Sequence, residues 1–354
     1  MNVFLIETPH QLLNAIEAKN TLELTDNHLF IVILDGYPEN SYKPLVVYED
    51  WEEVRFIPSK IKSGHPIAEY FRTHPSERVR NYYDTFVELR NLRKRLDEIA
   101  RSVYGVENLF LGNYFKVYTR HFSNIIKPQR LCLLDDGNAT LFINTMRKQD
   151  SPVVRVQGYN TIKDNIIYNI IGLNIKQAEN ITFFTTYDLE TIDGDSIIKN
   201  EYRYFRKMME LSQPCDEVFF LGSTMASEGF PEDLYMKYMA MVQEYFKEEN
   251  FVYIPHKCEP EERVNCLKQT LGMNVKRFDV PIEYQLSVRG TIPKVLTSFF
   301  SSALENCRVI FGPHLHIKSF YIDPVLFPLA PDFVKDVYDY YRSKSSPYFE
   351  VVDL

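Results

Sequence analysis

Short apolar runs alternate with amphipathic stretches of helix length through most of this sequence. This alternation predicts βαβ units, because a helix that follows a strand carries the chain back to pair the next strand in parallel. The expected strands lie near 2–6, 29–34, 53–57, 108–112, 130–134, 152–157, 181–186, 216–221, 251–254, 275–279, 293–297 and 308–311. The expected helices lie near 11–19, 77–104, 115–126, 139–147, 163–175, 232–247, 260–271, 299–306 and 331–342. The sequence therefore predicts an α/β protein with mainly parallel sheets.

The α/β pattern is interrupted by a polar and charged stretch at 188–214. A chain of 354 residues favours two domains of roughly 150 residues or slightly more. We therefore expect a Rossmann-like domain at 1–190, a linker at 191–214 and a second Rossmann-like domain at 215–330. The last residues, 331–354, are expected to form a helix and tail that cross back to the first domain.

Charge and cysteine content exclude several classes of function. The net charge of -8 argues against nucleic acid as a partner, because nucleic-acid binders need Lys and Arg to neutralise phosphates. The 5 cysteines are scattered without CxxC spacing, which argues against a disulfide framework or a zinc site and favours a reducing cytoplasm. The first residues do not read as a signal peptide, and no apolar run approaches the roughly 20 residues that span a bilayer.

Two adjacent carboxylates, Asp135 and Asp136, follow the apolar run at 130–134 and precede Gly137. Open α/β sheets place their chemistry at the carboxyl ends of strands, and a carboxylate there can take a proton from a substrate hydroxyl. Successive side chains of a strand point to opposite faces, so Asp136 is the candidate base while Asp135 contacts an acceptor or holds the loop. The alternative is a turn without catalytic role, since Asp and Gly are favoured turn formers.

A histidine, His256, ends a second strand, directly after the apolar run at 251–254 and Pro255. An imidazole at this place can donate a hydrogen bond or a proton to a departing phosphate. The alternative is a histidine that satisfies a backbone carbonyl at the end of the strand. The pairs His65-Pro66 and His74-Pro75 are interpreted as loop residues, because no apolar strand leads into them.

Hydroxyl side chains surround the expected start of the helix at 299–306. They are Thr297, Ser298, Ser301 and Ser302. The amino terminus of a helix offers free N–H groups and a partial positive charge, so a phosphate can bind there with hydroxyl support. Ordinary capping by a serine is the alternative. Gly222 and Ser223, which follow the expected strand at 216–221, are further candidates for a nucleotide contact through backbone amides.

With these residues in this order, the chain resembles bacterial sialyltransferases, especially glycosyltransferase family 52 and the bacterial polysialyltransferases. The family's acidic pair before glycine stands here as Asp135-Asp136-Gly137, its histidine-proline motif is approximated by Pro255-His256-Lys257, and its serine motif by Ser298 with Ser301-Ser302. The stretch at 5–13 also looks like that group's first strand and turn. Lys257 stands where the family usually has proline, a residue that contributes rigidity to the loop and not chemistry.

The resemblance implies a GT-B type fold, in which two Rossmann-like domains with parallel sheets face a central cleft. It implies an inverting transfer of sialic acid from CMP-sialic acid to a galactose-terminated glycan of the lipooligosaccharide or capsule type. Asp136 would be the base, His256 would assist the departure of CMP, and Glu283 matches the position that holds the nucleotide ribose. The expected donor site comprises Thr297, Ser298, Ser301, Ser302, Glu283, Gly222 and Ser223. The expected acceptor site comprises Thr8, Pro9, Gln11, Asn113 and Asp135.

No metal and no cofactor beyond the CMP-sugar is expected, because this donor carries a single phosphate. Asp193-Gly194-Asp195 imitates the metal-binding signature of other glycosyltransferases, but it falls in the expected linker. A lipid-linked acceptor and peripheral association with the cytoplasmic membrane stay open. The apolar stretch at 162–175 would suit such a contact, although packing in the core is the simpler interpretation.

Several alternatives remain open. Another CMP-linked keto-sugar acid, such as Kdo, legionaminic acid or pseudaminic acid, or the extension of polysialic acid would keep the fold and change the substrate. A sugar-nucleotide epimerase of similar architecture would use a UDP-sugar and show no acceptor-dependent reaction. A non-catalytic binding protein of GT-B-like fold would tolerate the loss of Asp136.

Overall fold

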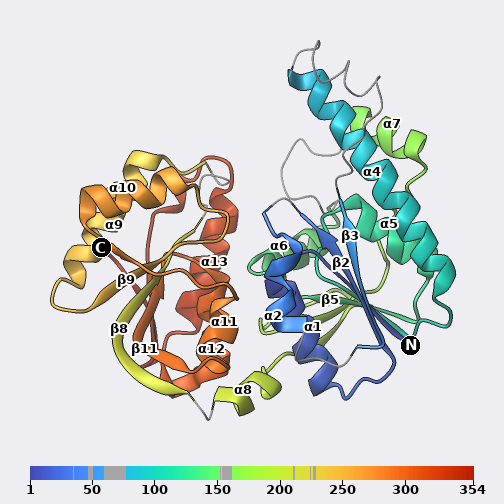
Figure 1. Cartoon of the computed structure of the whole chain (residues 1–354). Coiled ribbons are helices and arrows are strands. Elements are labelled where there is room, and N and C mark those ends of the chain that lie inside the picture. The colour runs from blue at the N-terminus through green and yellow to red at the C-terminus, as the bar shows by residue number, and fades with distance from the viewer. Residues whose placement is uncertain are drawn as a thin grey trace. The chain divides into compact units, whose positions relative to one another are not determined.

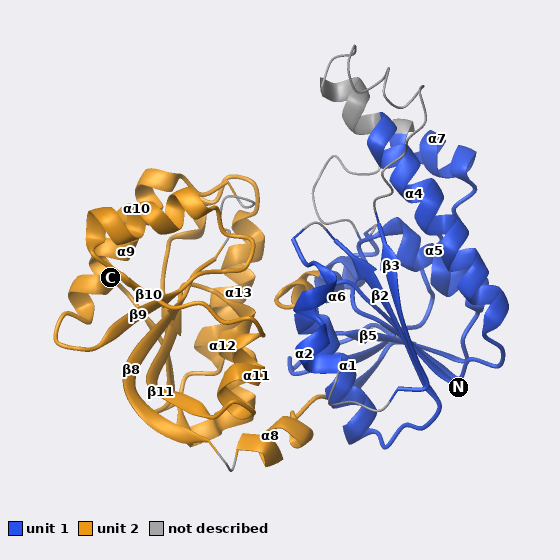
Figure 2. Cartoon of the chain, viewed as in Figure 1, with its two compact units in different colours: residues 1–136, 143–199 blue, residues 137–142, 200–354 orange. Residues whose placement is uncertain are grey.

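The computed structural model divides the chain into two compact units (Figures 1 and 2). The described residues are 1–34, 36–46, 51–59, 77–151, 153, 162–209, 212–223, 225 and 229–354. Unit 1 comprises Met1–Asp136 and Ile143–Lys199, and unit 2 comprises Gly137–Phe142 and Asn200–Leu354. The histidine-proline pairs at 65–66 and 74–75 lie outside the described residues, as does nearly all of the strand expected at 152–157.

Unit 1 is built on a seven-stranded sheet with the order β3-β2-β1-β4-β5-β6-β7. Its strands are β1 (Asn2–Ile6), β2 (Asn27–Ile33), β3 (Glu53–Pro58), β4 (Asn108–Leu111), β5 (Arg130–Leu134), β6 (Thr182–Thr185) and β7 (Ser196–Lys199). All neighbouring strands pair in parallel. The central strands β1 and β4 are buried along their whole length, which explains why they read as continuous apolar runs.

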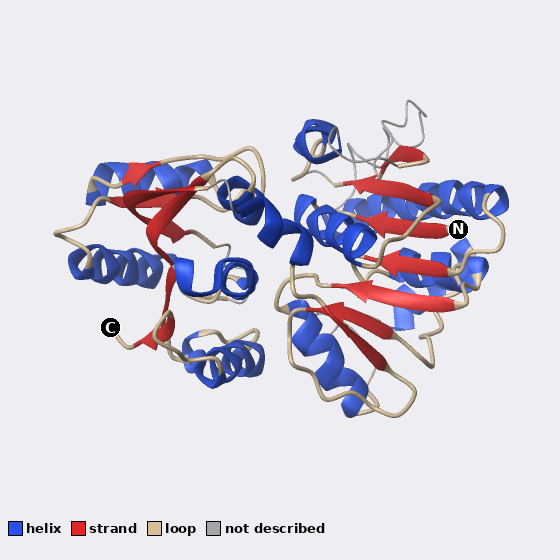
Figure 3. Ribbon diagram, turned by 90° about the horizontal axis from the view of Figure 1, so that it is seen from below, coloured by secondary structure: helices blue, strands red, loops and turns tan. Residues whose placement is uncertain are grey.

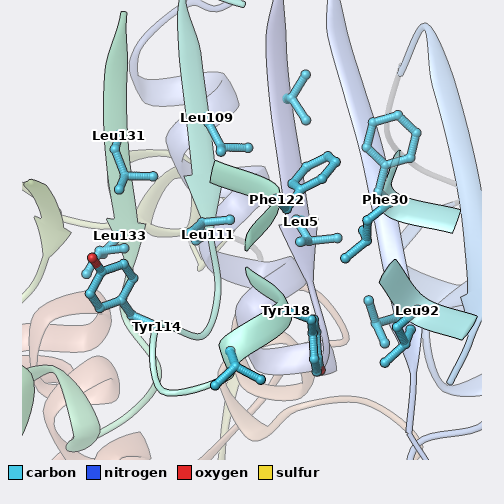
Figure 4. Packing of buried hydrophobic residues seen from close by; sticks show 14 of the residues in the cluster. Leu5, Phe30, Leu92, Leu109, Leu111, Tyr114, Tyr118, Phe122, Leu131 and Leu133 are labelled. Carbon is cyan, nitrogen blue, oxygen red and sulfur yellow. The ribbon is translucent and has the colours of Figure 1, made fainter. Parts of the chain in front are cut away.

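Helices of unit 1 cover the sheet and bury its apolar residues. They are α1 (Pro9–Thr21), α2 (Lys43–Val46), α4 (Glu77–Ser102), α5 (Val117–Ile126), the end of α6 (Ala139–Lys148) and α7 (Ile162–Ile171), with a short 3-10 turn η1 (Glu39–Ser41). In the sheet, Leu5 pairs with Leu111 and Leu111 with Leu133, which sets three leucines in a row across β1, β4 and β5. Phe122 of α5 and Leu92 of α4 belong to the same buried cluster (Figure 4).

Unit 2 is built on a six-stranded parallel sheet with the order β10-β9-β8-β11-β12-β13. Its strands are β8 (Gln213–Leu221), β9 (Phe251–Ile254), β10 (Asn274–Val275), β11 (Thr291–Ser298), β12 (His316–Phe320) and β13 (Phe349–Val352). Its helices are α8 (Arg203–Met209), α9 (Glu232–Tyr245), α10 (Glu261–Leu271), α11 (Ile282–Ser287), α12 (Ser302–Phe311) and α13 (Pro331–Ser343), with 3-10 turns η3 (Gly312–His314) and η4 (Pro324–Leu326). Figure 3 shows helices flanking the strands of both sheets.

The predicted fold class is confirmed: the protein is α/β, with parallel sheets of seven and six strands in two consecutive Rossmann-like units, a GT-B-like organisation. In both sheets the second and third strands in the chain lie to one side of the first, and all later strands continue in chain order on its other side. This is the strand order of dinucleotide-binding folds. That the two sheets face one cleft stays a prediction.

The division of the chain differs from the expected one at three places. Unit 1 extends to Lys199, because β7 completes its sheet inside the stretch that was expected to be a linker. The segment Gly137–Phe142 belongs to unit 2. The C-terminal residues form α13 and β13 within unit 2, where β13 pairs with β12, instead of crossing back to the first unit.

The strand expected at 308–311 is wrong, since these residues end helix α12.

Helix α7 covers much of the apolar stretch at 162–175. It contacts α4 and buries Ile171, whereas Ile166 and Ile170 are exposed. In the part of the chain that the structure describes, no helix has the length and apolar character needed to span a bilayer. Association of this surface with a membrane stays a prediction.

Candidate functional site

The strand order of each sheet reverses at one point, and open α/β sheets bind ligands outside the carboxyl ends of the strands at that point. In unit 1 the reversal lies between β1 and β4, and in unit 2 between β8 and β11. Asp136 follows β5, next to β4, and His256 follows β9, next to β8. The topology therefore sets the two candidate catalytic residues beside the reversal points of their own sheets.

Gln11 links the ends of β1 and β5. Its side-chain Oε1 accepts the backbone N–H of Glu7 at 2.7 Å, and its Nε2 donates to Oδ1 of Asp136 at 2.7 Å. The amide is fully buried and needs the space beside Gly112, where a Cβ atom would lie 2.2 Å from Oε1 of Gln11. A donor held in this way fixes the orientation of the Asp136 carboxyl.

Glu7 ends β1 with a buried carboxyl group that is 1% exposed. Its Oε1 accepts the hydroxyl of Tyr118 at 2.5 Å, and its Oε2 accepts Nδ2 of Asn113 at 3.1 Å. The pKa of Glu7 is raised to about 7, mainly by burial. Lys116 and the two hydrogen bonds act in the opposite direction, while the nearby charge of Asp136 adds to the rise.

Asp135 is buried and joins neighbouring parts of unit 1. Its Oδ2 accepts the backbone N–H of Thr186 at 2.8 Å and the Thr186 hydroxyl at 3.3 Å, and its carbonyl oxygen accepts Nδ2 of Asn14 at 3.1 Å. These bonds tie the end of β5 to the residue after β6 and to α1. These contacts hold the loop, which is one of the two roles that the sequence analysis considered for Asp135.

The other predicted acceptor residues also take part in local structure. Thr8 caps α1, where its hydroxyl accepts the N–H of Gln11 at 3.2 Å, and Pro9 occupies the first turn. Asn113 accepts the N–H of Phe115 with its Oδ1 at 2.9 Å in addition to its bond with Glu7. Their contact with a glycan stays a prediction.

His256 in unit 2 has a defined tautomer. The backbone N–H of Cys258 donates to its Nδ1 at 3.2 Å, so in the neutral ring the proton resides on Nε2. Burial lowers the pKa of the imidazole, which favours the neutral form at pH 7. Nε2 of the neutral ring therefore carries a proton, so this atom can donate a hydrogen bond but cannot accept a proton.

Glu259 holds the loop that carries His256. Its Oε2 accepts the backbone N–H of His256 at 3.1 Å, and its Oε1 accepts the hydroxyl of Tyr253 at 2.6 Å. The Tyr253 hydroxyl in turn lies 2.7 Å from that of Tyr235, over whose ring the guanidinium of Arg263 stacks at 4.5 Å. Burial raises the pKa of Glu259.

Gly222 and Ser223 follow β8, at the reversal point of unit 2. A Cβ atom at Gly222 would lie 2.4 Å from the Tyr253 hydroxyl and 2.5 Å from Oε2 of Glu259, so only glycine fits. The carbonyl of Ser223 accepts a guanidinium N–H of Arg263 at 3.0 Å.

Thr297 and Ser298 end β11, the other strand at this point. Ser298 donates to the carbonyl of Leu221 at 2.7 Å. The hydroxyls of Thr297 and Ser223 are buried and find no hydrogen-bond partner among the described residues.

Helix α12 begins at the predicted hydroxyl cluster. Ser301 is its N-cap and accepts the N–H of Ala303. Asn138, from the segment that follows Asp136 in the chain, donates to the carbonyl of Phe300 at 2.7 Å. Gly137 approaches the same turn, because a Cβ atom there would lie 2.8 Å from the Ser302 hydroxyl.

Glu283 lies in α11 and is 2% exposed. Its Oε1 accepts Nδ2 of Asn306 in α12 at 2.8 Å. The structure thus gives this carboxyl a partner within unit 2, and its contact with a ribose stays a prediction.

Asp195, in the sequence that imitates a metal-binding signature, forms a buried ion pair. Its carboxylate accepts Nε of Arg147 at 2.6 Å and the N–H of Ile181 at 2.8 Å. These contacts fix the turn before β7 to the end of α6.

Sequence reasoning missed several residues of these clusters, among them Glu7, Tyr118 and Glu259. The side chain of Glu7 is separated from its partners by more than 100 positions, since Asn113 lies 106 and Tyr118 lies 111 residues away. The only local signal is that a carboxylate directly follows an apolar strand, which is the pattern that singled out Asp135 and Asp136.

No family model matches the chain, and no curated protein sequence matches it. Among solved structures it is similar to the GT-B domain of a sialyltransferase from Photobacterium damselae, with 11% identity over 96% of both chains and a TM-score of 0.46. It is similar to Arabidopsis thaliana UGT89C1 complexed with UDP, with 12% identity over 99% of this chain and 85% of that chain and a TM-score of 0.49. It is also similar to the Methanocaldococcus jannaschii UDP-GlcNAc 2-epimerase, with 10% identity over 99% of this chain and 96% of that chain and a TM-score of 0.47. These similarities concern the course of the backbone.

Proposed function

We propose that the protein is a glycosyltransferase of the inverting type that transfers sialic acid from CMP-sialic acid to a glycan that ends in galactose. Unit 1 would supply the acceptor site and the base, and unit 2 would supply the donor site. The observation that carries the proposal is that each of two predicted catalytic residues follows a strand beside the reversal point of its own parallel sheet.

Asp136 would take the proton of the attacking hydroxyl. The hydrogen bond from Gln11 engages Oδ1 and orients the carboxyl group that would act as the base. The oxygen of the deprotonated hydroxyl then bonds to the anomeric carbon as the bond from that carbon to the CMP phosphate oxygen breaks.

His256 would stabilise the departing CMP. A phosphate monoester leaves as a stable anion, so it needs a hydrogen bond and positive potential more than a proton. A neutral imidazole whose proton resides on Nε2 suits this role, because Nδ1 already accepts the N–H of Cys258. The first turn of α12 and the buried hydroxyl of Thr297 would offer further donors to the phosphate.

Release of CMP tests the proposal directly. With purified protein, CMP-sialic acid and lactose, we expect acceptor-dependent CMP release that persists in EDTA. Asp136→Asn and His256→Ala should each lower turnover roughly 100-fold or more, the usual contribution of a general base or of one donor to a developing anion. His256→Gln retains an N–H donor near the position of Nε2 and should recover part of the loss.

Matched controls are Asp150→Asn in unit 1 and His316→Ala in unit 2, both at exposed positions. Near-normal turnover in both Asp136→Asn and His256→Ala would end the assignment. Release of CMP from CMP-Kdo, but not from CMP-sialic acid, would keep the mechanism and replace the donor. Turnover of a UDP-sugar without an acceptor would favour an epimerase.

A further inference from the structure

We propose that Glu259 is a positioning residue for His256: its buried carboxyl group fixes the turn that carries the imidazole, and Arg263 holds that carboxyl group against the neighbouring turn at Ser223. This inference deepens the proposed function and rests on it for its catalytic meaning. Its geometric part, the state of the His256 ring, can be measured without any reaction.

The carboxyl group of Glu259 bonds to the loop of His256 through both of its oxygens. Oε2 accepts the backbone N–H of His256 at 3.1 Å, and Oε1 accepts the hydroxyl of Tyr253 at 2.6 Å. The backbone N–H of Glu259 donates in turn to the carbonyl of His256 at 2.9 Å. Because Tyr253 belongs to β9, these bonds anchor the turn of His256 to the strand from which it emerges.

Arg263 extends this support to the next strand of the sheet. Its Nη1 lies 3.6 Å from Oε1 of Glu259 and donates to the carbonyl of Ser223 at 3.0 Å. Its Nε and Nη2 donate to the two carboxylate oxygens of Glu232 at the start of α9. Since Ser223 follows β8 and His256 follows β9, Glu259 and Arg263 join the turns that end two adjacent strands.

Glu259 and Arg263 are 5% and 6% exposed. A buried polar group that loses its partner keeps the cost of its desolvation, so an arrangement in which every member is bonded is strongly favoured. Well-packed apolar side chains can stabilise a fold as well as a buried ion pair does. We therefore attribute to these two residues a fixed orientation of the two turns.

The orientation of the imidazole depends on the turn that Glu259 holds. The N–H of Cys258, which donates to Nδ1 of His256 at 3.2 Å, lies between the two residues that the carboxyl group ties together. Loss of the carboxyl group should free this turn, so that Nδ1 loses its donor and the neutral ring loses its defined tautomer. Glu259 would thus act on the departing phosphate only through His256.

Nitrogen-15 NMR of the full chain with labelled histidine tests the geometric part. The His256 ring is assigned by its absence in His256→Ala, and in its neutral form it should carry the proton on Nε2. In Glu259→Ala both tautomers should be populated. Glu259→Gln should keep most of the wild-type pattern, because its amide oxygen can still accept the N–H of His256. Glu262→Gln, at an exposed position of α10, is the matched control and should change nothing.

Kinetics separate positioning from a general loss of structure. In the assay of CMP release, Glu259→Ala should lower kcat by up to about 100-fold, as a small misplacement of a functional group can. The KM for CMP-sialic acid should change little, because the contact of His256 with the phosphate gains strength as charge develops. In the His256→Ala background the same substitution should cost almost nothing further, because the group that Glu259 positions is gone.

An unchanged tautomer in Glu259→Ala, or an equal loss of kcat with and without His256, overturns the inference. If Glu259→Ala fails to fold, Tyr253→Phe takes its place, since it removes the donor to Oε1 and keeps the ring. It should shift the tautomers of His256 in the same direction by less, and no shift would count against the positioning role. Absence of CMP release in the wild-type protein would refute the proposed function and leave the NMR result to decide on the positioning.

Discussion

Glu7 makes the stability of the protein depend on pH in a direction opposite to that of an ion-paired carboxylate. Its pKa is about 7 in the folded chain, against 4.5 for an ordinary glutamate. Between these two values the folded state binds more protons than the unfolded state, so the free energy of unfolding falls as the pH rises from about 4.5 to about 7. The stabilisation is fully present below the unfolded pKa and is lost above the folded one.

The size of this effect is about 3 kcal/mol, since each unit of pKa difference corresponds to ~1.4 kcal/mol. Urea denaturation at several pH values should show the fall in the wild-type protein and a flatter profile in Glu7→Gln. Parallel profiles in the two proteins would mean that the pKa of Glu7 is the same in the folded and unfolded states.

The close approach of Gln11 explains why position 112 holds a glycine. A Cβ atom there would lie 2.2 Å from Oε1 and 2.5 Å from Cδ of Gln11. Gly112→Ala should therefore displace the amide, cost about 1–3 kcal/mol of stability as overpacking does, and lower turnover because Asp136 loses its donor.

Gln11→Ala tests the cause, because it removes the side chain that the new methyl group would meet. In that background the cost of Gly112→Ala in the free energy of unfolding should shrink, as expected for residues in contact. If Gly112→Ala lowers the free energy of unfolding by as much in the Gln11→Ala background, the new methyl group does not clash with Gln11.

At the scale of elements, the sequence predicted most of what positions the site. The strands that precede Asp136 and His256 are short and mostly apolar and buried, and both were expected at their observed bounds. Helices α5, α9, α10 and α13 were expected as well, because their apolar residues recur at helical spacing.

The missed elements share a physical reason. β7 is a four-residue edge strand with mostly exposed residues, and it lacks an apolar signal. β12 and β13 mix lysine, serine and glutamate with apolar residues, so they look like loops. The apolar residues at 309–311 read equally well as a strand or as the end of a helix, and the N-cap at Ser301 decides for the helix.

The contacts of the site were harder to predict than its position. Asp136 could be found from its place after β5, but its link to Gln11 spans 125 residues and the bond from Asn306 to Glu283 depends on how two helices pack. Sequence patterns report which residues end a strand. They do not report which buried polar groups then meet.

At the scale of the whole molecule, each unit has its own parallel sheet, and the chain passes between the units after Asp136, after Phe142 and after Lys199. Asp136, the candidate base, is thus the last residue of unit 1 before the chain first enters unit 2. Under the proposed function neither unit could catalyse transfer alone, because the base and the donor to the leaving group come from different units.

A crystal structure of the protein with CMP and lactose tests this central claim most directly. The account predicts that Nε2 of His256 lies within hydrogen-bond distance of a CMP phosphate oxygen, about 2.6–3.2 Å, and that a carboxylate oxygen of Asp136 lies at a similar distance from a galactose hydroxyl. CMP bound away from His256, or an acceptor bound away from Asp136, would contradict it.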